Sequence, residues 1–247
     1  MNVQSDIKDN LKKLCLSGDV KTIESTDLDQ CKSGFVLMYA AEIGSMDIVK
    51  VMFRKYKQFH CNDLSNAIGY ACDNNHFDIA KFIKESGPVP NSEAVNLLAD
   101  TNSLDGFKWI VDQFDFKDMR HNRNFIFRAH CSKGNVDIVK WIATKFEFNA
   151  DDVRILWCSA FRSACNGGYN ELAQWLVTEF NLTVNDVEST FNYLMAIINK
   201  DSNMREIIKW LHERFSSLKF EPEPEPVQNP DVMTLTSGSY SDSDSGS

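Results

Sequence analysis

One short phrase recurs along most of this chain, and internal repetition of this kind constrains the fold more than any other feature of the sequence. The clearest copies are GSMDIVKVM at 44–52 and GNVDIVKWI at 134–142, and NHFDIAKFI at 75–83 is a third. Each copy opens with Gly or Asn, and successive openings are 26 to 35 residues apart: Gly18, Gly44, Asn75, Asn102, Gly134, Gly168 and Asn203. We expect one small structural unit per copy, with neighbouring units stacked on each other.

Two columns of residues before the openings predict a first helix in every unit. Seven residues before each opening the side chains are apolar: Leu11, Leu37, Ile68, Val95, Phe127, Phe161 and Ala196. Three residues before it they are small, apart from Lys200 in the last unit: Cys15, Ala41, Cys72, Ala99, Cys131 and Cys165. Because these two positions are four residues apart, they share one face of a helix.

The residues after each opening predict a second helix. In the unit of Gly134, the residues Ile138, Val139, Trp141 and Ile142 form a broad apolar stripe at helical spacing. Gly and Asn tolerate left-handed backbone, so we expect a positive φ at each opening, where the first helix ends. An acidic residue follows in five units, near the positive end of the second helix: Asp47, Asp78, Asp105, Asp137 and Glu171. We expect an aromatic-rich column of the second helix to lie in the core: Val51, Phe82, Trp109, Trp141, Trp175 and Trp210.

These helix pairs resemble the ankyrin repeat over residues 7–215. The segments that match its pattern A-A-x-x-G-x-x-x-[IV]-V-x-x-L are AAEIGSMDIVKVM, ACDNNHFDIAKFI, CSKGNVDIVKWI and ACNGGYNELAQWL. The Trp column and the spacers at 147–154 and 180–188 resemble the ankyrin variant of amoebae and large DNA viruses. The resemblance implies an all-α, ankyrin-like solenoid of about seven stacked helix-turn-helix repeats. The Thr-Pro-Leu-His opening of the family is absent, which leaves the formation of β-hairpin fingers open.

The composition changes sharply near the end of the chain. Residues 216–247 are rich in Pro, Glu, Ser and Asp, and carry six acidic residues but one base, Lys219. Such a segment cannot bury enough apolar surface to offset its ordering entropy, so we predict a solenoid at 1–215 and a disordered acidic tail at 216–247. Ser239 and Ser241 each precede an acidic residue by three positions, and we expect acidophilic kinases to phosphorylate them.

Several classes of function are disfavoured. A net charge of −9 opposes nucleic-acid binding, and no apolar run approaches the ~18 residues of a membrane span. The seven cysteines include no CxxC pair, and four of them occupy the small-residue column, so we predict no metal and no cofactor. His130 and Cys131 are adjacent, but neighbouring helical residues point apart, and we predict no catalytic residues. Without a signal peptide, unpaired cysteines favour an intracellular location, in the cytoplasm or, for a viral protein, the host cytoplasm.

The resemblance therefore implies a non-catalytic protein-binding module, an adaptor or scaffold, which we expect to be monomeric. In such stacks the first helices line a concave face. There we predict an interface for a partner with a basic patch, made by two tyrosines and an acidic ridge: Tyr39, Glu42, Tyr70, Asp73 and Asp100. A solvated helix face is the simpler interpretation of the same residues. A substrate-recruiting subunit of a ubiquitin-ligase complex and a Cys-dependent enzyme are the alternatives.

Overall fold

The computed structural model describes residues 3–197 and 204–218, and within these ranges the chain forms helices and no strand. The predicted all-α fold is confirmed. In chain order the helices are α1 (Val3–Leu16), α2 (Val20–Ser25), α3 (Gln30–Glu42), α4 (Met46–Lys55), α5 (Cys61–Asp73), α6 (Phe77–Ser86), α7 (Asn91–Asp100), α8 (Leu104–Gln113), α9 (His121–Lys133), α10 (Val136–Lys145), α11 (Ala150–Asn166), α12 (Asn170–Glu179), α13 (Val184–Ile197) and α14 (Met204–Arg214).

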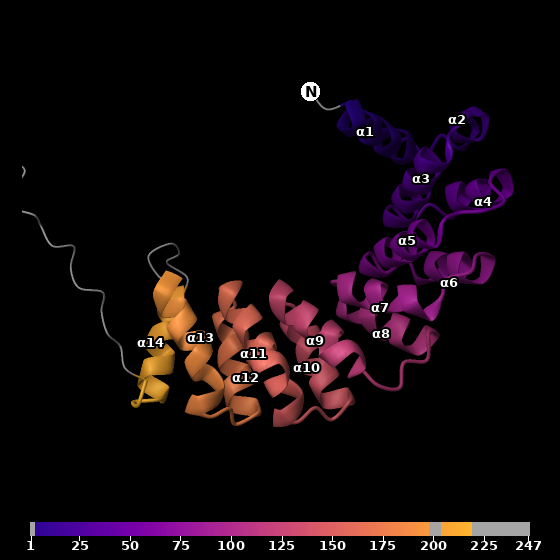
Figure 1. Ribbon diagram of the computed structural model, residues 1–247. Coiled ribbons are helices and arrows are strands. Elements are labelled where there is room, and N and C mark those ends of the chain that lie inside the picture. Colours follow the sequence, from indigo (N-terminus) through magenta and orange to yellow (C-terminus); the bar gives the residue numbers. More distant parts are fainter. Residues whose placement is uncertain (1–2, 198–203, 219–247) are drawn as a thin grey trace, which may run out of the picture.

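Consecutive helices pair into hairpins that stack in a single curved row (Figure 1). The odd-numbered helices pack on one another along the inner side of the curve, and the even-numbered helices form the outer side. Each hairpin thus covers the apolar face of its neighbour, as expected for a solenoid. Beyond α14 the Leu218 side chain is buried, and its carbonyl oxygen lies 3.0 Å from Nδ1 of His212. The division of the chain at residue 215 stays a prediction. Residues 219–247 lie outside the described part of the chain.

The turn within each hairpin follows the predicted pattern at most openings. The values of φ are 67° at Gly18, 77° at Gly44, 62° at Asn75, and 72° at both Gly134 and Gly168. The prediction is wrong for Asn102, and Asn203 lies outside the described residues.

The exception at Asn102 arises because its repeat ends the first helix differently. Helix α7 stops at Asp100, and Thr101 continues in extended backbone with φ −63° and ψ 132°. The chain then needs no left-handed residue, because the hydroxyl of Ser103 caps helix α8 by accepting a hydrogen bond from the Gly106 N–H at 3.2 Å.

The small-residue column of the first helices is buried as predicted, and it includes Cys15, Cys72, Cys131 and Cys165. Of the apolar column seven residues before the openings, Leu11, Leu37, Ile68, Phe127 and Phe161 are buried and Val95 is half-buried; the side chain of Ala196 lies outside the described part. The aromatic-rich column of the second helices packs against the core, but only Val51 is buried, and Phe82 and the tryptophans are partly covered.

The physical reason is visible at Trp141. This position lies at the edge of the apolar stripe, so one side of the indole packs on the rings of Phe107 and Phe146, with centroids 5.7 Å and 5.9 Å away. The other side remains accessible to solvent.

Two segments in the later repeats have left-handed backbone. Residues 122–124 at the start of α9 and 156–158 within α11 have φ between 49° and 59°. Both segments occupy the same position relative to Gly134 and Gly168. Left-handed backbone costs about 1–2 kcal/mol per non-glycine residue, so the surrounding packing must hold these turns in place. The turn in α11 leaves Trp157 82% exposed.

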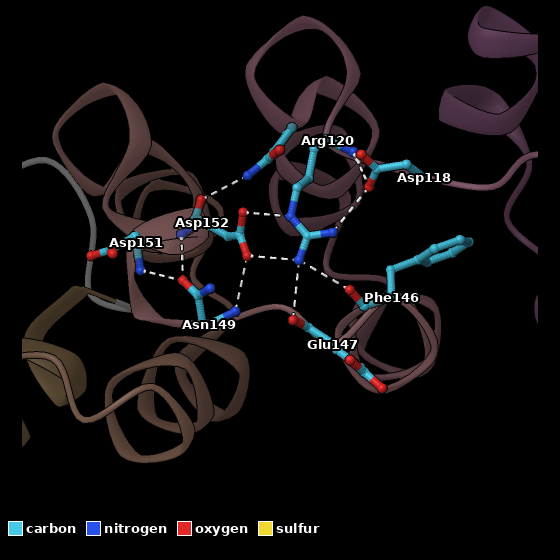
Figure 2. A network of polar contacts seen from close by, with 8 residues as sticks. Asp118, Arg120, Phe146, Glu147, Asn149, Asp151 and Asp152 are labelled. Carbon is cyan, nitrogen blue, oxygen red and sulfur yellow. Dashed lines mark hydrogen bonds and ion pairs between the residues drawn. The ribbon is translucent and has the colours of Figure 1, made fainter.

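An arginine links neighbouring repeats at the base of this region (Figure 2). Arg120 donates from Nε to Oδ1 of Asp152 at 2.9 Å and from Nη2 to Oδ2 at 3.0 Å. Nη2 also donates to the carbonyls of Phe146 and Glu147, which end the preceding helix, at 3.0 Å and 3.1 Å. The carboxylate of Asp152 in turn accepts the backbone N–H of Asn149 at 2.9 Å and so caps α11.

The next repeat boundary uses the same arrangement. Arg154 donates from Nε to Oδ1 of Asp186 at 2.9 Å and from Nη2 to Oδ2 at 3.2 Å. Asp186 accepts the backbone N–H of Thr183 at 2.7 Å. Arg120 and Arg154 stand fourteen residues before Gly134 and Gly168, a periodicity that the sequence analysis did not use.

We expect Arg120→Met to lower the free energy of unfolding by about 2–3 kcal/mol, as measured by urea denaturation followed by circular dichroism. The substitution leaves Asp152, whose side chain is 10% exposed, without its cation. The value lies below that of a fully buried pair because the arginine side chain is 36% exposed. Arg162→Met, at a position with no ion pair among the described residues, is the control. Equal effects of the two substitutions would contradict a specific link between repeats.

Candidate protein-binding groove

A groove of about 530 Å³ lies on the inner side of the row, between α5 and α7. Its polar lining combines one tyrosine, three carboxylates and four amides: Tyr70, Asp73, Glu93, Asp100, Asn62, Asn66, Asn96 and Asn102. Each amide offers both hydrogen-bond donors and acceptors, whereas the carboxylates only accept. The groove is therefore suited to a ligand with several donors and a positive charge.

A glycine in α5 allows the two helices that form the groove to come close. A Cβ atom on Gly69 would lie 3.0 Å from Cδ1 of Leu97, a separation tighter than ordinary side-chain packing. Leu97 is buried and forms the apolar floor of the groove. A side chain at residue 69 would push this floor outward and make the groove shallower.

The structure divides the predicted interface residues into two groups. Tyr70, Asp73 and Asp100 line the groove, and the Tyr70 side chain is 42% exposed. Tyr39 and Glu42 are not part of it, because both contact Lys12 of α1. The Lys12 ammonium lies 2.9 Å from Oε1 of Glu42 and 5.5 Å from the centre of the Tyr39 ring.

The acidic ridge carries less free charge than its sequence indicates. Oδ1 of Asp73 accepts hydrogen bonds from the backbone N–H groups of Asn102 and Ser103 at 2.8 Å and 3.0 Å. The Asp73 carboxylate therefore holds the chain in place where α8 begins. Asp100 forms an ion pair with Lys133 at 3.0 Å, which neutralises part of its charge.

Glu93 is the groove carboxylate that sequence reasoning missed. It stands in the first turn of α7, and in the described part of the chain it forms no ion pair. The sequence could have indicated Glu93, because it is an acidic residue one helical turn before the inner-face positions of the fourth repeat. Of the three groove carboxylates, Asp100 is paired with Lys133, whereas Asp73 and Glu93 form no ion pair among the described residues, so the groove keeps a negative charge.

Comparison with known proteins agrees with the stacked hairpins. Residues 3–94 match the family model of ankyrin repeats, in three copies. Residues 3–94 are thus ankyrin repeats. The matched region contains helices α1 to α6 and the start of α7, and the later hairpins continue the same helix-pair arrangement. No curated protein and no solved structure matches the chain. The resemblance to the variant of amoebae and large DNA viruses therefore stays a prediction.

The buried cysteines of this ankyrin stack are poor nucleophiles. Burial raises the pKa of the Cys15 and Cys158 thiols to about 11 and that of Cys131 further still, so all three stay protonated at neutral pH. His130 beside Cys131 is itself buried, and desolvation lowers its pKa to about 4. No group of three or more potential metal ligands occurs within 3–197 and 204–218. In the same ranges no helix combines the length and hydropathy needed to cross a membrane.

Proposed function

We propose that this ankyrin-repeat protein is an adaptor or scaffold that holds a partner protein in the groove between α5 and α7. The ankyrin stack is a protein–protein interaction module, and the groove gives that general role a chemical preference. The observation that carries the proposal is the exposed ring of Tyr70 beside the carboxylates of Asp73, Glu93 and Asp100 in one concavity.

This arrangement favours an arginine or lysine side chain of the partner. A cation over a tyrosine ring gains about 0.5–2 kcal/mol, and carboxylates nearby strengthen the attraction. The flanking amides of Asn66 and Asn96 can then bond the partner's backbone, which fixes its orientation. We expect an arginine-containing segment to be preferred to a lysine-containing one, because guanidinium both stacks and forms paired hydrogen bonds.

The free thiols support an intracellular place of action. All seven cysteines are unpaired, as expected in a reducing compartment. We propose that the protein acts as a monomer, since stacked hairpins bury their apolar faces against each other. A substrate-recruiting role in a ubiquitin-ligase complex is one form of adaptor, and no feature of the described residues favours it over others. The cysteines of the small-residue column are buried and the pKa of their thiols is raised, which disfavours a Cys-dependent enzyme.

Selection of random peptides displayed on phage against the full chain tests the groove. We expect enriched peptides to carry Arg, and Tyr70→Ala to weaken their binding about tenfold, which corresponds to about 1.4 kcal/mol. Glu93→Lys should weaken it at least as much, because it places a like charge beside the ligand cation.

Matched controls lie on α13, away from the groove. Tyr193 is 46% exposed, close to the exposure of Tyr70, and Glu188 is an exposed acid on the same helix. We expect Tyr193→Ala and Glu188→Lys to leave peptide binding unchanged. Enriched peptides without basic residues, or equal losses in the α5 and α13 variants, would refute the proposal.

A further inference from the structure

A second groove, of about 690 Å³, lies on the opposite, outer side of the row, where α2, α4 and α6 meet. Its apolar lining comes from Val20, Val51, Phe53 and Phe82. Its charged lining consists of three bases and one acid: Lys21, Lys50, Arg54 and Asp47. This groove is thus apolar with a positive rim, the reverse of the acidic groove on the inner side.

At one position of this groove the second repeat differs from the later ones. Seven residues after its opening stands Val51, whereas the later repeats carry larger rings there: Phe82, Trp109, Trp141, Trp175 and Trp210. The smaller Val51 side chain lines the groove, beside Phe82 of the next repeat.

The lysine that precedes this column is also different in the second repeat. Four of the five later repeats carry a lysine there, and each is engaged: Lys81 lies 3.9 Å from Glu85, Lys108 lies 3.9 Å from Asp105, Lys140 lies 5.7 Å from the Trp175 ring, and Lys209 lies 3.9 Å from Glu213. Lys50 has no such partner in the described part of the chain, and neither does Lys21. Arg54 is only loosely held, at 3.5 Å from Glu24.

The chain itself contains a segment of matching chemistry. Residues 219–247 hold six acidic residues and one base, and they include apolar side chains at Phe220, Val232, Met233 and Leu235. We propose that this C-terminal segment binds in the outer groove of its own chain. Its acids would then face Lys21 and Lys50, and its apolar side chains would cover the floor.

The length of the segment permits this placement. Its 29 residues, from 219 to 247, can span up to ~100 Å when extended. Neighbouring helices pack about 10 Å apart, so the five steps from the α14 hairpin to the α4 hairpin amount to roughly 50 Å. Attachment to the same chain raises the effective concentration of the segment at the groove. The acidic α5–α7 groove would repel the segment, which favours the outer groove. The proposal does not depend on what binds between α5 and α7.

Photo-crosslinking in the full chain tests the proposal. Benzoylphenylalanine in place of Tyr240 puts the reactive group between the acidic residues of the segment. After irradiation, we expect mass spectrometry to find crosslinks to peptides of α2 and α4. Reversing two charges with Lys21→Glu and Lys50→Glu should reduce these crosslinks at least fivefold, because attraction becomes repulsion.

Two controls make the result decisive. The pair Lys108→Glu and Lys140→Glu changes the net charge equally on the same outer side, and should leave the crosslinks unchanged. Lys21 and Lys50 are exposed, and circular dichroism checks that each variant stays folded. Crosslinks confined to other helices, or insensitive to the Lys21 and Lys50 reversal, would overturn the proposal. Mixed-isotope crosslinks between labelled and unlabelled chains would also overturn it, since the segment would then bind a second copy.

Discussion

Replacing Phe127 by Ala should lower the free energy of unfolding by about 3–5 kcal/mol, as large-to-small core substitutions do. Phe127 is fully buried in the apolar column of the first helices, and its ring lies 4.9 Å from that of Phe148 in a tilted pair. The cavity would open between the fourth, fifth and sixth hairpins, where α9 packs on both α7 and α11. Urea denaturation followed by circular dichroism measures the loss.

The half-buried tryptophan of the same repeat provides the comparison. Trp141→Ala removes a larger side chain but should cost only about 2 kcal/mol, because part of the indole is already in contact with water. If Trp141→Ala proved the more damaging of the two, the aromatic edge rather than the first-helix column would form the core of this repeat.

Lowering the pH from about 6.5 to 4 should destabilise the protein by about 3 kcal/mol through His130 alone. Desolvation lowers the pKa of this buried imidazole from 6.5 to about 4, so the folded state favours the neutral ring. The Asn135 amide nitrogen donates to Nδ1 at 3.1 Å, and Nε2 therefore carries the proton that it donates to the Leu98 carbonyl at 2.9 Å. Lys133 lowers the pKa further, and Asp100 opposes it.

The direction follows from which state binds the proton more readily. Below pH 6.5 the unfolded chain takes up a proton at His130 while the folded chain does not. The free energy of unfolding therefore decreases as the pH is lowered, until the folded ring also takes up a proton. We expect His130→Gln to remove this slope of the unfolding free energy between pH 6.5 and 4.5. His121→Gln changes an exposed imidazole and should leave the slope intact. A slope that persists in the His130 variant would show that other groups cause it.

Much of the fold follows from short-range pattern. The apolar and small columns lie four residues apart, and the openings require left-handed backbone, so both can be recognised within one copy of the repeat. Comparison of copies then identifies which small residues are buried in the stack, as it does for Cys72 and Cys131. The pattern fails at Asn102, because there a Ser103 cap replaces the glycine-type turn.

The binding groove was only partly predictable. Tyr70, Asp73 and Asp100 share inner-face positions in consecutive repeats, and the structure brings them together. Tyr39 and Glu42 stand at the same positions of their repeat, but both contact Lys12 of the preceding repeat. The spacing of residues along the sequence does not predict this contact between repeats. The predicted phosphorylation of Ser239 and Ser241 lies outside the described residues and stays a prediction.

By itself, the sequence determined that this chain is a row of ankyrin-like helix hairpins with cysteines and alanines in the buried small-residue column, because helical periodicity is a local property. Only the tertiary structure decided which carboxylates remain free, how Arg120 joins Asp152, and where grooves open on the two sides. These depend on distances between side chains of different repeats, and a difference of one residue in a connecting loop changes such distances without changing the pattern within any helix.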